Sequence, residues 1–295
     1  MSRAPGFFSL PAAVYHADPC EMPSLSASAA HTLVSRSPLH VWREHPRLGG
    51  MGKRRTEAMD LGTIVHALLL GGTEALKPLP FNDYRTAAAR EARCAAVAAG
   101  LVPVKAPLAA KGAAIGAAIG LELQRLGIVL GGRSEMTAIW SEDAMPAPVT
   151  CRARLDHLDG RTIYDLKVVE SAHPDAIRRH MMTFGSAIQA TAYTRAVEYL
   201  RPELAGRVRF VFLFCEVETG IVTPATLGGT MRELGARQWD RAVATWARCM
   251  ATNTWPPYAD RPVAIEAPNW AIEAEENVLL DERAAQSAQE EIDDG

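Results

Sequence analysis

The sequence lacks the cysteine pattern of several protein classes. It has five cysteines among 295 residues, and no two of them form a C-x-x-C pair. This scatter removes the usual signature of zinc ribbons, thioredoxin-like proteins and cysteine-bound iron–sulfur clusters. It favours a reducing compartment, because disulfides persist mainly outside the cytoplasm. The five are Cys20, Cys94, Cys151, Cys215 and Cys249.

Long hydrophobic runs and an excess of one charge are also missing. The most membrane-like stretch, residues 113–121, has about half of the ~20 residues that cross a bilayer. The first ten residues contain no apolar segment typical of a secretory signal peptide. The 31 Lys and Arg against 34 Asp and Glu give a net charge of -3, which excludes a histone-like polycation but not an enzyme with a basic groove. We expect a cytoplasmic protein without membrane contact.

Three nucleotide and nucleophile motifs do not occur. There is no G-x-x-x-x-G-K-[ST] phosphate loop, no G-x-G-x-x-G dinucleotide fingerprint and no G-x-S-x-G turn. These absences argue against a helicase, a Rossmann-type enzyme and an α/β-hydrolase. The hydrophobic fraction of 48% is nevertheless typical of a globular protein with a sizeable core.

The order of predicted elements changes along the chain. Apolar periodicity and capping residues predict helices over 24–34, 37–45 and 58–70 and an Ala-rich pair between 86 and 126. Alternating or apolar runs predict strands at 136–140, 149–158, 162–169 and 208–217. Helices are expected at 175–200, interrupted near Gly185, and at 230–250.

This order predicts an α/β protein with an extra helical portion at its N-terminus. Residues 1–22 are expected to form an irregular arm, and residues 23–281 a single domain. Within that domain, 23–132 is the helical part and 133–260 the core. The acidic residues 282–295 are expected to be disordered.

The most informative segment is CRARLDHLDGRTIYDLKVV, residues 151–169. Asp165 and Lys167 are two apart in a predicted strand and therefore share a face. The Asp159-Gly160 turn predicts a hairpin, which can bring Asp156 near Asp165. Two carboxylates beside an ammonium group can form an oxygen-rich site for Mg²⁺ or Mn²⁺.

On spacing alone, Asp-x-Lys is also typical of a solvated strand face. The neighbours Ile163, Leu166 and Val168 indicate a largely buried strand. Buried charges are costly unless they are paired or bind a metal. The metal site and the solvated face both remain open at this point.

Other segments accompany this pattern in a fixed order. They are SLSASAAHTLVSRSPLHVW from Ser24, GTIVHALLL from Gly62, a helix that carries Gln189 and Tyr193, and TWPPY from Thr254. Together they resemble the PD-(D/E)XK nuclease superfamily. More narrowly, they look like the RecE-type exodeoxyribonucleases (exodeoxyribonuclease VIII) and RecB-like nucleases of phages and prophages. The resemblance extends from about residue 23 to residue 258.

The resemblance implies a restriction-endonuclease-like core, in which helices flank a central mixed sheet, and it implies roles for individual residues. The implied metal ligands are His66, Asp156, Asp165 and the backbone carbonyl of Leu166, with Lys167 as the active-site lysine, Gln189 and Tyr193 beside them, and Glu135 as a supporting acid. In each case a structural role is the alternative: His66 could be a core histidine, and Gln189 and Tyr193 ordinary helix residues.

Two features depart from the family pattern. Leu155 precedes Asp156, where many relatives have proline, and the clustered cysteines of the iron–sulfur branch are absent. Binding of DNA would depend on basic residues near the site, whose phosphate contacts give salt-dependent affinity. The expected ones are Lys53, Arg54, Arg55, Arg152, Arg154, Arg178 and Arg179, each of which could instead be an ordinary solubilising charge.

The resemblance implies a Mg²⁺-dependent exonuclease that degrades linear double-stranded DNA from its 5′ ends and leaves single-stranded tails for recombination. It further implies a homo-oligomer, a single-strand annealing protein as partner, and a phage or prophage gene expressed in a bacterial cytoplasm. Two alternatives stay open: a nuclease of the same superfamily that acts on single-stranded or branched DNA, and a catalytically silent DNA-binding protein.

Overall fold

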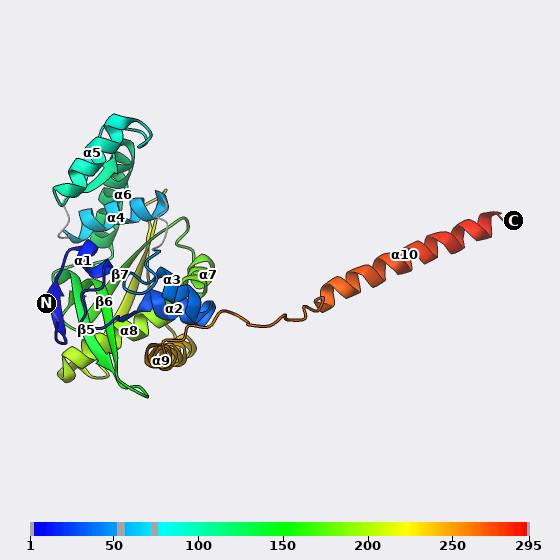
Figure 1. The fold of residues 1–295 in the computed structure, drawn as a ribbon. Coiled ribbons are helices and arrows are strands. Elements are labelled where there is room, and N and C mark those ends of the chain that lie inside the picture. Colours follow the sequence, from blue (N-terminus) through cyan, green and yellow to red (C-terminus); the bar gives the residue numbers. More distant parts are fainter. Residues whose placement is uncertain (1–2, 52–56, 72–75, 294–295) are drawn as a thin grey trace. The chain divides into compact units, whose positions relative to one another are not determined.

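The computed structural model describes residues 3–51, 57–71 and 76–293. The chain divides into two units, Met1–Pro257 and Tyr258–Gly295. The first unit contains a seven-stranded mixed sheet with helices on both faces (Figure 1). This agrees with the α/β class and with the central mixed sheet that we expected.

The strand order of the sheet is β1-β5-β6-β7-β8-β9, and β2 pairs with β6. The β7–β8 and β2–β6 pairs are parallel and the others are antiparallel. All four predicted strands are present, three of them with longer or shifted ends. The strands are β1 (Gly6–Ser9), β2 (Leu25–Ser26), β5 (Arg133–Glu142), β6 (Val149–Asp159), β7 (Thr162–Val169), β8 (Arg209–Glu216) and β9 (Val222–Ala225).

The helices of the first unit follow the predicted order. Ser26 and Thr86 cap two of them, because each side chain accepts a hydrogen bond from the backbone N–H three residues on. A separate parallel pair, β3 (Leu76–Leu79) and β4 (Val102–Lys105), lies outside the main sheet. The helices are α1 (Ala12–His16), α2 (Ala27–Ser35), α3 (Pro38–Glu44), α4 (Glu57–Leu70), α5 (Ala87–Ala98), α6 (Ala106–Arg125), α7 (Pro174–Phe184), α8 (Ser186–Leu200), α9 (Gly229–Thr252) and the short 3₁₀ helix η1 (Pro202–Leu204).

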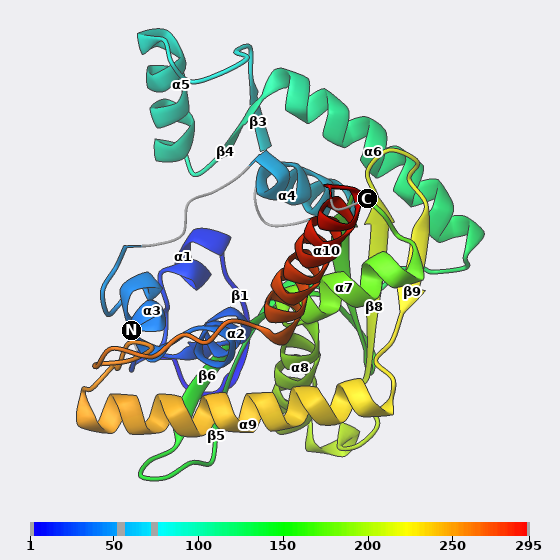
Figure 2. The same ribbon diagram turned by 90° about the vertical axis from the view of Figure 1, so that its right-hand side faces the viewer.

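Three apolar clusters pack against the main sheet. The largest joins α2, α8 and α9 to β5 and β6 and contains Trp140, Trp239 and Trp246. The second joins α4 and α6 to β7 and β8 and contains Ile64 and Leu213. The smallest joins α7 and α8 to β8 and contains Phe212 and Phe214. Figure 2 shows α9 and α6 well separated, with the strands between them. A side chain between β6 and β7 can therefore meet groups from both helical layers.

Close packing of α4 against α6 fixes the position of α4. A Cβ atom on Gly112 would lie 2.4 Å from Cγ2 of Ile64, so the two helices approach at a residue without a side chain. By length and composition, α6 is long and apolar enough to cross a membrane, but a third of its most apolar segment is buried inside the protein. Its buried residues Leu108, Ile115 and Ile119 contribute to the core with α4, which accounts for its apolar composition.

The break in the helical stretch 174–200 occurs at Gly185, as expected. Gly185 has a φ of 69° and ends α7 in the left-handed region, which favours glycine. A Cβ atom there would lie 2.5 Å from the His31 ring. This residue therefore sets the direction in which α8 leaves α7.

The expected irregular arm, residues 1–22, is wrong at two short segments and irregular elsewhere in its described part. It contains β1, which pairs with β5, and α1, and the side chain of Asp18 is fully buried. A four-residue edge strand is too short to produce a visible period in the sequence, and its partner lies about 130 residues away.

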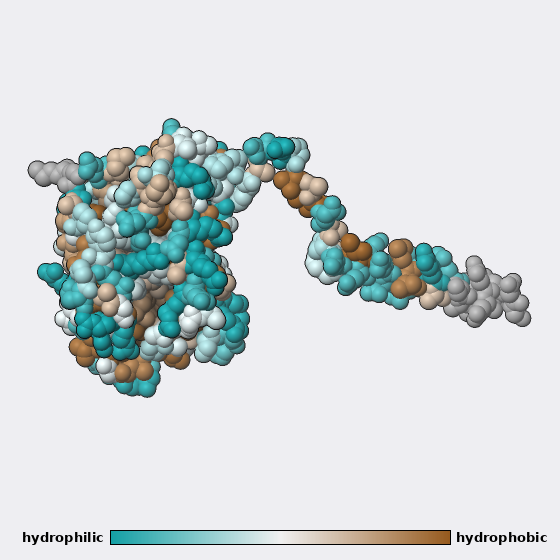
Figure 3. All heavy atoms as spheres, turned by 90° about the horizontal axis from the view of Figure 1, so that it is seen from below, coloured by the Kyte–Doolittle hydropathy of each residue, from teal (hydrophilic) through white to brown (hydrophobic). Residues whose placement is uncertain are grey.

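The C-terminal unit differs from the expected disordered tail. The compact first unit ends at Pro257, after Trp255 has packed against Trp246 and the carbonyl of Pro256 has accepted a hydrogen bond from Leu39. The second unit contains one helix, α10 (Asn269–Asp293), which continues through the acidic residues. Figure 3 shows apolar and hydrophilic side chains alternating along it.

Candidate active site

The candidate site lies where β6 and β7 separate. Their antiparallel ladder ends at the pair His157–Tyr164, one residue before Asp156 would face Asp165. There the Oδ2 atom of Asp156 accepts a hydrogen bond of 2.8 Å from the backbone N–H of Leu166. The carboxylate thus takes the place of a backbone acceptor in the gap between the strands.

The regular alternation of β6 breaks at Asp156. Leu155 lies in the core under α8 and α9, whereas the His157 ring lies beside Tyr164, which packs with the α4–α6 core. Residues two apart on a regular strand share a face, so the strand must be distorted between them. On the neighbouring strand, Glu135 stands at the same level with a φ of 56°.

Helix α4 brings His66 to the same gap. The Nε2 atom of His66 lies 2.9 Å from the carbonyl oxygen of Leu166, and Nδ1 lies 3.6 Å from Oδ2 of Asp156. His66 and Leu166 are 100 positions apart in the chain. The imidazole, the Asp156 carboxylate and the Leu166 carbonyl, three of the four groups implied as metal ligands, therefore meet at one place.

The fourth implied ligand, Asp165, is held on both sides. Its side chain is 1% exposed and forms an ion pair with Lys167 through Oδ2. The Nε2 atom of Gln189, on α8, donates a hydrogen bond of 2.6 Å to Oδ1. Lys167 also lies over the Phe212 ring, 5.8 Å from its centre. The shared face predicted for Asp165 and Lys167 is present, and Gln189 contacts the carboxylate directly.

Burial and charge change the proton affinity of this group of side chains. Burial, together with the charge of Asp165, raises the pKa of Asp156 to about 6, although His66 and Lys167 act in the opposite direction. Burial alone would lower the pKa of Lys167, but Asp165 and Asp156 outweigh it and the pKa is raised. The lysine is therefore held as a cation beside the two carboxyl groups.

Tyr193 lies one helical turn after Gln189 and has a more structural position. It is buried and packs against Phe210 at 6.1 Å between ring centres. Burial raises the pKa of its hydroxyl well above the usual value, although a hydrogen bond with Gln189 lowers it. Tyr193 therefore supports Gln189 from the side of the core.

The donor set fits a hard divalent cation. It combines two carboxylates, an imidazole and a backbone carbonyl, and the buried Oδ2 of Asp165 contacts Lys167 without a well-directed hydrogen bond. Within the described ranges, no three His, Cys, Asp or Glu side chains already form a cage. Lys167 and Gln189 contact Asp165, and the Leu166 carbonyl oxygen lies 2.9 Å from Nε2 of His66.

Arg152 has a structural role, so its expected contact with DNA is wrong. Its side chain is buried, and Nη1 donates 2.6 Å hydrogen bonds to the carbonyl and the hydroxyl of Ser24. It also pairs with Asp18 at 3.3 Å, as does His45. We call Asp18, Ser24, His45 and Arg152 the Asp18 cluster. The partners of Arg152 lie in the N-terminal segment, which alternation along β6 does not reveal.

Arg154 and Glu135 are also mutual partners. Nε of Arg154 lies 2.5 Å from Oε2 of Glu135, and Nη1 donates to the carbonyl of Leu10 at 2.7 Å. Arg154 therefore holds β1 and β5 together rather than facing solvent. Glu135 affects the site only at a distance, since its charge contributes to the raised pKa of Asp156.

The remaining expected DNA contacts have different outcomes. Arg178 and Arg179 are exposed on α7, and Arg178 pairs with Asp175 at 2.8 Å. Lys53, Arg54 and Arg55 lie outside the described residues.

Sequence reasoning missed His180, which lies close to the site. Its ring packs edge-on against Phe214 at 5.4 Å, and burial, followed by the charge of Lys167, lowers its pKa. A histidine in a helix of mixed composition gives no local signal. The only signal was its helix position nine residues before Gln189.

Comparisons with known proteins agree at the level of the fold. No family model matches the chain, and no match was found among curated proteins. A solved structure from Eubacterium rectale, described only provisionally as an exonuclease, superposes with a TM-score of 0.58 at 11% identity. The superposition covers 89% of this chain and 97% of the E. rectale chain. A second structure, of the protein SSO0001, reaches a TM-score of 0.31 at 10% identity over 74% and 76% of the chains, which is too low to support an argument.

The likeness to the E. rectale protein concerns nearly the whole of both chains. At 11% identity it shows that this chain shares the fold of that protein, and it identifies neither an activity nor a substrate. The assignment of an activity therefore rests on the side chains of the candidate site.

Proposed function

We propose that this protein is a Mg²⁺-dependent deoxyribonuclease of the PD-(D/E)XK superfamily, and specifically a RecE-like exonuclease that digests linear double-stranded DNA from its 5′ ends. The single observation that supports it best is the meeting of His66, Asp156, Asp165 and Lys167 at the gap between β6 and β7. These residues come from three elements, and no packing requirement alone explains the polarity of the group. The direction of digestion, from the 5′ end, is taken from the family resemblance.

Each residue has a distinct role in the proposed reaction. His66, Asp156, Asp165 and the Leu166 carbonyl would hold the divalent cation, which supplies charge neutralisation at the phosphate and lowers the pKa of water when bound. Lys167, held as a cation, orients the attacking water and stabilises the charge that develops on the phosphate oxygens. Gln189 fixes the rotamer of Asp165 through its hydrogen bond.

The exposed side of the site is where a DNA strand would approach. Lys167 is 23% and His66 24% exposed, whereas Asp165 is almost fully covered. The site therefore combines a buried, fixed carboxylate, that of Asp165, with two accessible side chains, those of Lys167 and His66. Arg178 and Arg179 on α7 are the described basic residues that we assign to phosphate contacts.

The test is digestion of linear double-stranded DNA labelled at either the 5′ or the 3′ end, with Mg²⁺ or with EDTA. We expect Mg²⁺-dependent release of mononucleotides from the 5′-labelled end. Asp165→Asn keeps the shape of the side chain but removes its charge, and we expect cleavage to fall by at least about 10³-fold. Asp159→Asn, at the exposed last residue of β6, is the matched control and should cleave like the wild type.

Circular, nicked and flapped DNA complete the experiment. Release from nicks or flaps but not from linear ends would assign the same site to a structure-specific nuclease. Lack of metal-dependent cleavage of every substrate, with folding verified by circular dichroism, would overturn the proposal.

A further inference from the structure

A pocket in the first unit lies beside the candidate site but is separate from it. It has a volume of about 510 Å³ and lies between α8, the start of β8 and the loop from β9 to α9. None of His66, Asp156, Asp165 or Lys167 lines it. Its size is within the range of small-molecule sites.

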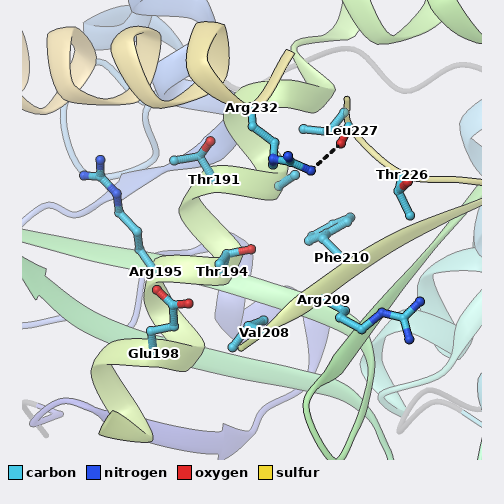
Figure 4. A pocket seen from close by; sticks show the side chains of 11 residues that line it. Thr191, Thr194, Arg195, Glu198, Val208, Arg209, Phe210, Thr226, Leu227 and Arg232 are labelled. Carbon is cyan, nitrogen blue, oxygen red and sulfur yellow. Dashed lines mark hydrogen bonds between the residues drawn. The ribbon is translucent and has the colours of Figure 1, made fainter. Parts of the chain in front are cut away.

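The pocket lining combines an aromatic floor with hydroxyl and guanidinium groups. Figure 4 shows Phe210 near the centre, with Thr194 of α8 on one side and Thr226 on the other. Arg232 extends from α9 toward this space, whereas the head groups of Arg195 and Arg209 extend to opposite sides. Arg232 is therefore the cation nearest to the middle of the pocket.

Several of these groups retain hydrogen-bonding capacity. Nη1 of Arg232 donates to the carbonyl of Leu227 at 2.9 Å, which leaves its other N–H groups available. In the part of the chain that the structure describes, the hydroxyls of Thr194 and Thr226 and the guanidinium of Arg209 have no hydrogen-bond partner. Of these groups, Arg232, Thr194 and Thr226 lie around the centre of the cavity, an arrangement typical of a site that orients a polar ligand.

The charges that remain available favour an anion. Arg195 is neutralised by Glu142 at 3.2 Å and Asp240 at 2.7 Å. Glu198, the acid among the lining residues, accepts a hydrogen bond from the backbone of Gly206. Arg209 and Arg232 then outnumber Glu198 among the lining charges, and Arg232 is the one whose head group extends toward the pocket, in a protein whose net charge is -3.

We propose that this pocket binds a nucleotide, with the phosphate near Arg232, Thr194 and Thr226 and the base over Phe210. A guanidinium with free N–H groups recognises phosphate by charge-assisted hydrogen bonds, and an aromatic face stacks on any base. The phosphate comes either from a free mononucleotide or from a DNA strand. The inference depends on the pocket alone and does not require the proposed nuclease activity.

The floor of the pocket also contacts the candidate site through aromatic rings. Phe210 packs on Phe212 at 4.6 Å between centres, and Phe212 lies under the ammonium of Lys167. Phe210 packs against Tyr193 as well. A base stacked on Phe210 would therefore be separated from Lys167 by two rings, those of Phe210 and Phe212.

The test is isothermal titration calorimetry of the full chain with deoxyadenosine 5′-monophosphate in EDTA, where no metal-dependent hydrolysis occurs. We expect saturable binding by the wild type and at least about tenfold weaker binding of deoxyadenosine, which lacks the phosphate. Arg232→Gln should weaken binding of the nucleotide by at least about tenfold, and Thr194→Val by several-fold. Arg237→Gln, on the same helix and exposed, is the matched control and should bind as the wild type does.

A 5′-phosphorylated single-stranded oligonucleotide distinguishes the two sources of phosphate. If the mononucleotide does not bind but Arg232→Gln weakens binding of the oligonucleotide, the pocket holds a phosphate of a strand. If neither ligand binds the wild type, or if both bind Arg232→Gln as tightly as the wild type, the proposal is wrong. Failure of the DNA digestion together with Arg232-dependent binding would reject the nuclease assignment and leave this inference intact.

Discussion

The molecule contains two clusters of buried charge that share much of their chemistry but differ in how completely they are paired. In the Asp18 cluster, hydrogen bonds from Ser24 and Cys20 and the ion pairs with His45 and Arg152 satisfy both carboxylate oxygens. In the candidate site, Oδ2 of Asp165 lacks a well-directed hydrogen bond, and Asp156, His66 and Lys167 are partly exposed.

The electrostatic consequence has opposite sign in the two clusters. Burial would raise the pKa of Asp18, but the hydrogen bond with His45, the charge of Arg152 and the bonds from Ser24 lower it well below its usual range. The pKa of Asp156 is raised to about 6 instead. The charge of Asp18 therefore increases the free energy of unfolding. The charge of Asp156 lowers it, and such a cost to stability is typical of functional sites.

The largest effect expected from this difference is on activity. Lys167→Met keeps the aliphatic stem over Phe212 but removes the ammonium, and we expect cleavage of DNA to fall by at least about 10³-fold. Lys111→Met, at an exposed position of α6, is the control. Single-turnover digestion measures the change. Wild-type rates in Lys167→Met would show that the lysine only balances the charge of Asp165.

In the Asp18 cluster the largest effect is on stability. Asp18→Asn leaves Arg152 as an uncompensated buried charge, so the free energy of unfolding should fall by about 3–5 kcal/mol. Because the pKa of Asp18 is lowered, its contribution is complete above the unfolded value near 3.8 and is lost on acidification below it.

Urea unfolding of Asp18→Asn, with Asp175→Asn as the exposed control, measures this loss. Cleavage by the folded fraction should be unchanged. A variant as stable as the wild type would mean that the cluster contributes specificity of packing rather than stability.

Asp156→Asn should have the opposite effect on stability. The amide oxygen can still accept the hydrogen bond from Leu166, while the penalty for burying the charge is removed, so in EDTA the unfolding free energy at pH 8 should rise by about 1–3 kcal/mol. Since the folded pKa of about 6 lies above the ordinary aspartate value of 3.8, the penalty is absent below pH 3.8 and increases up to pH 6. Above pH 6 the penalty is constant.

The pH series of denaturation midpoints for Asp156→Asn and the wild type therefore tests the sign directly. The two curves should meet near pH 4 and diverge toward neutral pH. If the variant is less stable at pH 8, then His66 and Lys167 stabilise the charge more than burial opposes it.

The smallest effect concerns the arginines. Arg179→Gln should reduce the slope of log affinity for DNA against log salt by about 0.9, as expected for one phosphate contact. Arg154→Gln should leave that slope unchanged and lower stability instead, because its guanidinium is engaged by Glu135 and Leu10. Filter binding across a salt series measures the slope for both variants. An equal loss of slope in the two would return Arg154 to the DNA interface.

Local spacing was sufficient to predict the most informative part of the site. The turn at Asp159-Gly160 and the two-residue spacing of Asp165 and Lys167 follow from strand geometry, and the structure brings them together as expected. The position of His66 came from the family resemblance, because its contact with Leu166 joins residues 100 positions apart.

The errors arose where the partners are distant in sequence. Arg152 and Arg154 resemble exposed basic residues until Ser24 and Leu10 are placed beside them, 128 and 144 positions away. The short edge strands β1 and β9 have too few residues for a period. Alternation describes which face a residue occupies and contains no information on what covers that face.

The contact between Ser24 and Arg152 also has a consequence for the order in which the chain can fold. Residues of the N-terminal segment are synthesised first, yet Asp18 has no cationic partner on β6 until Arg152 has followed 128 residues after Ser24. At roughly 5–20 residues per second, several seconds separate the two during translation. During this interval β1 and α1 have no sheet to join, so a nascent chain truncated before β6 should leave this segment open to proteases that the finished protein resists.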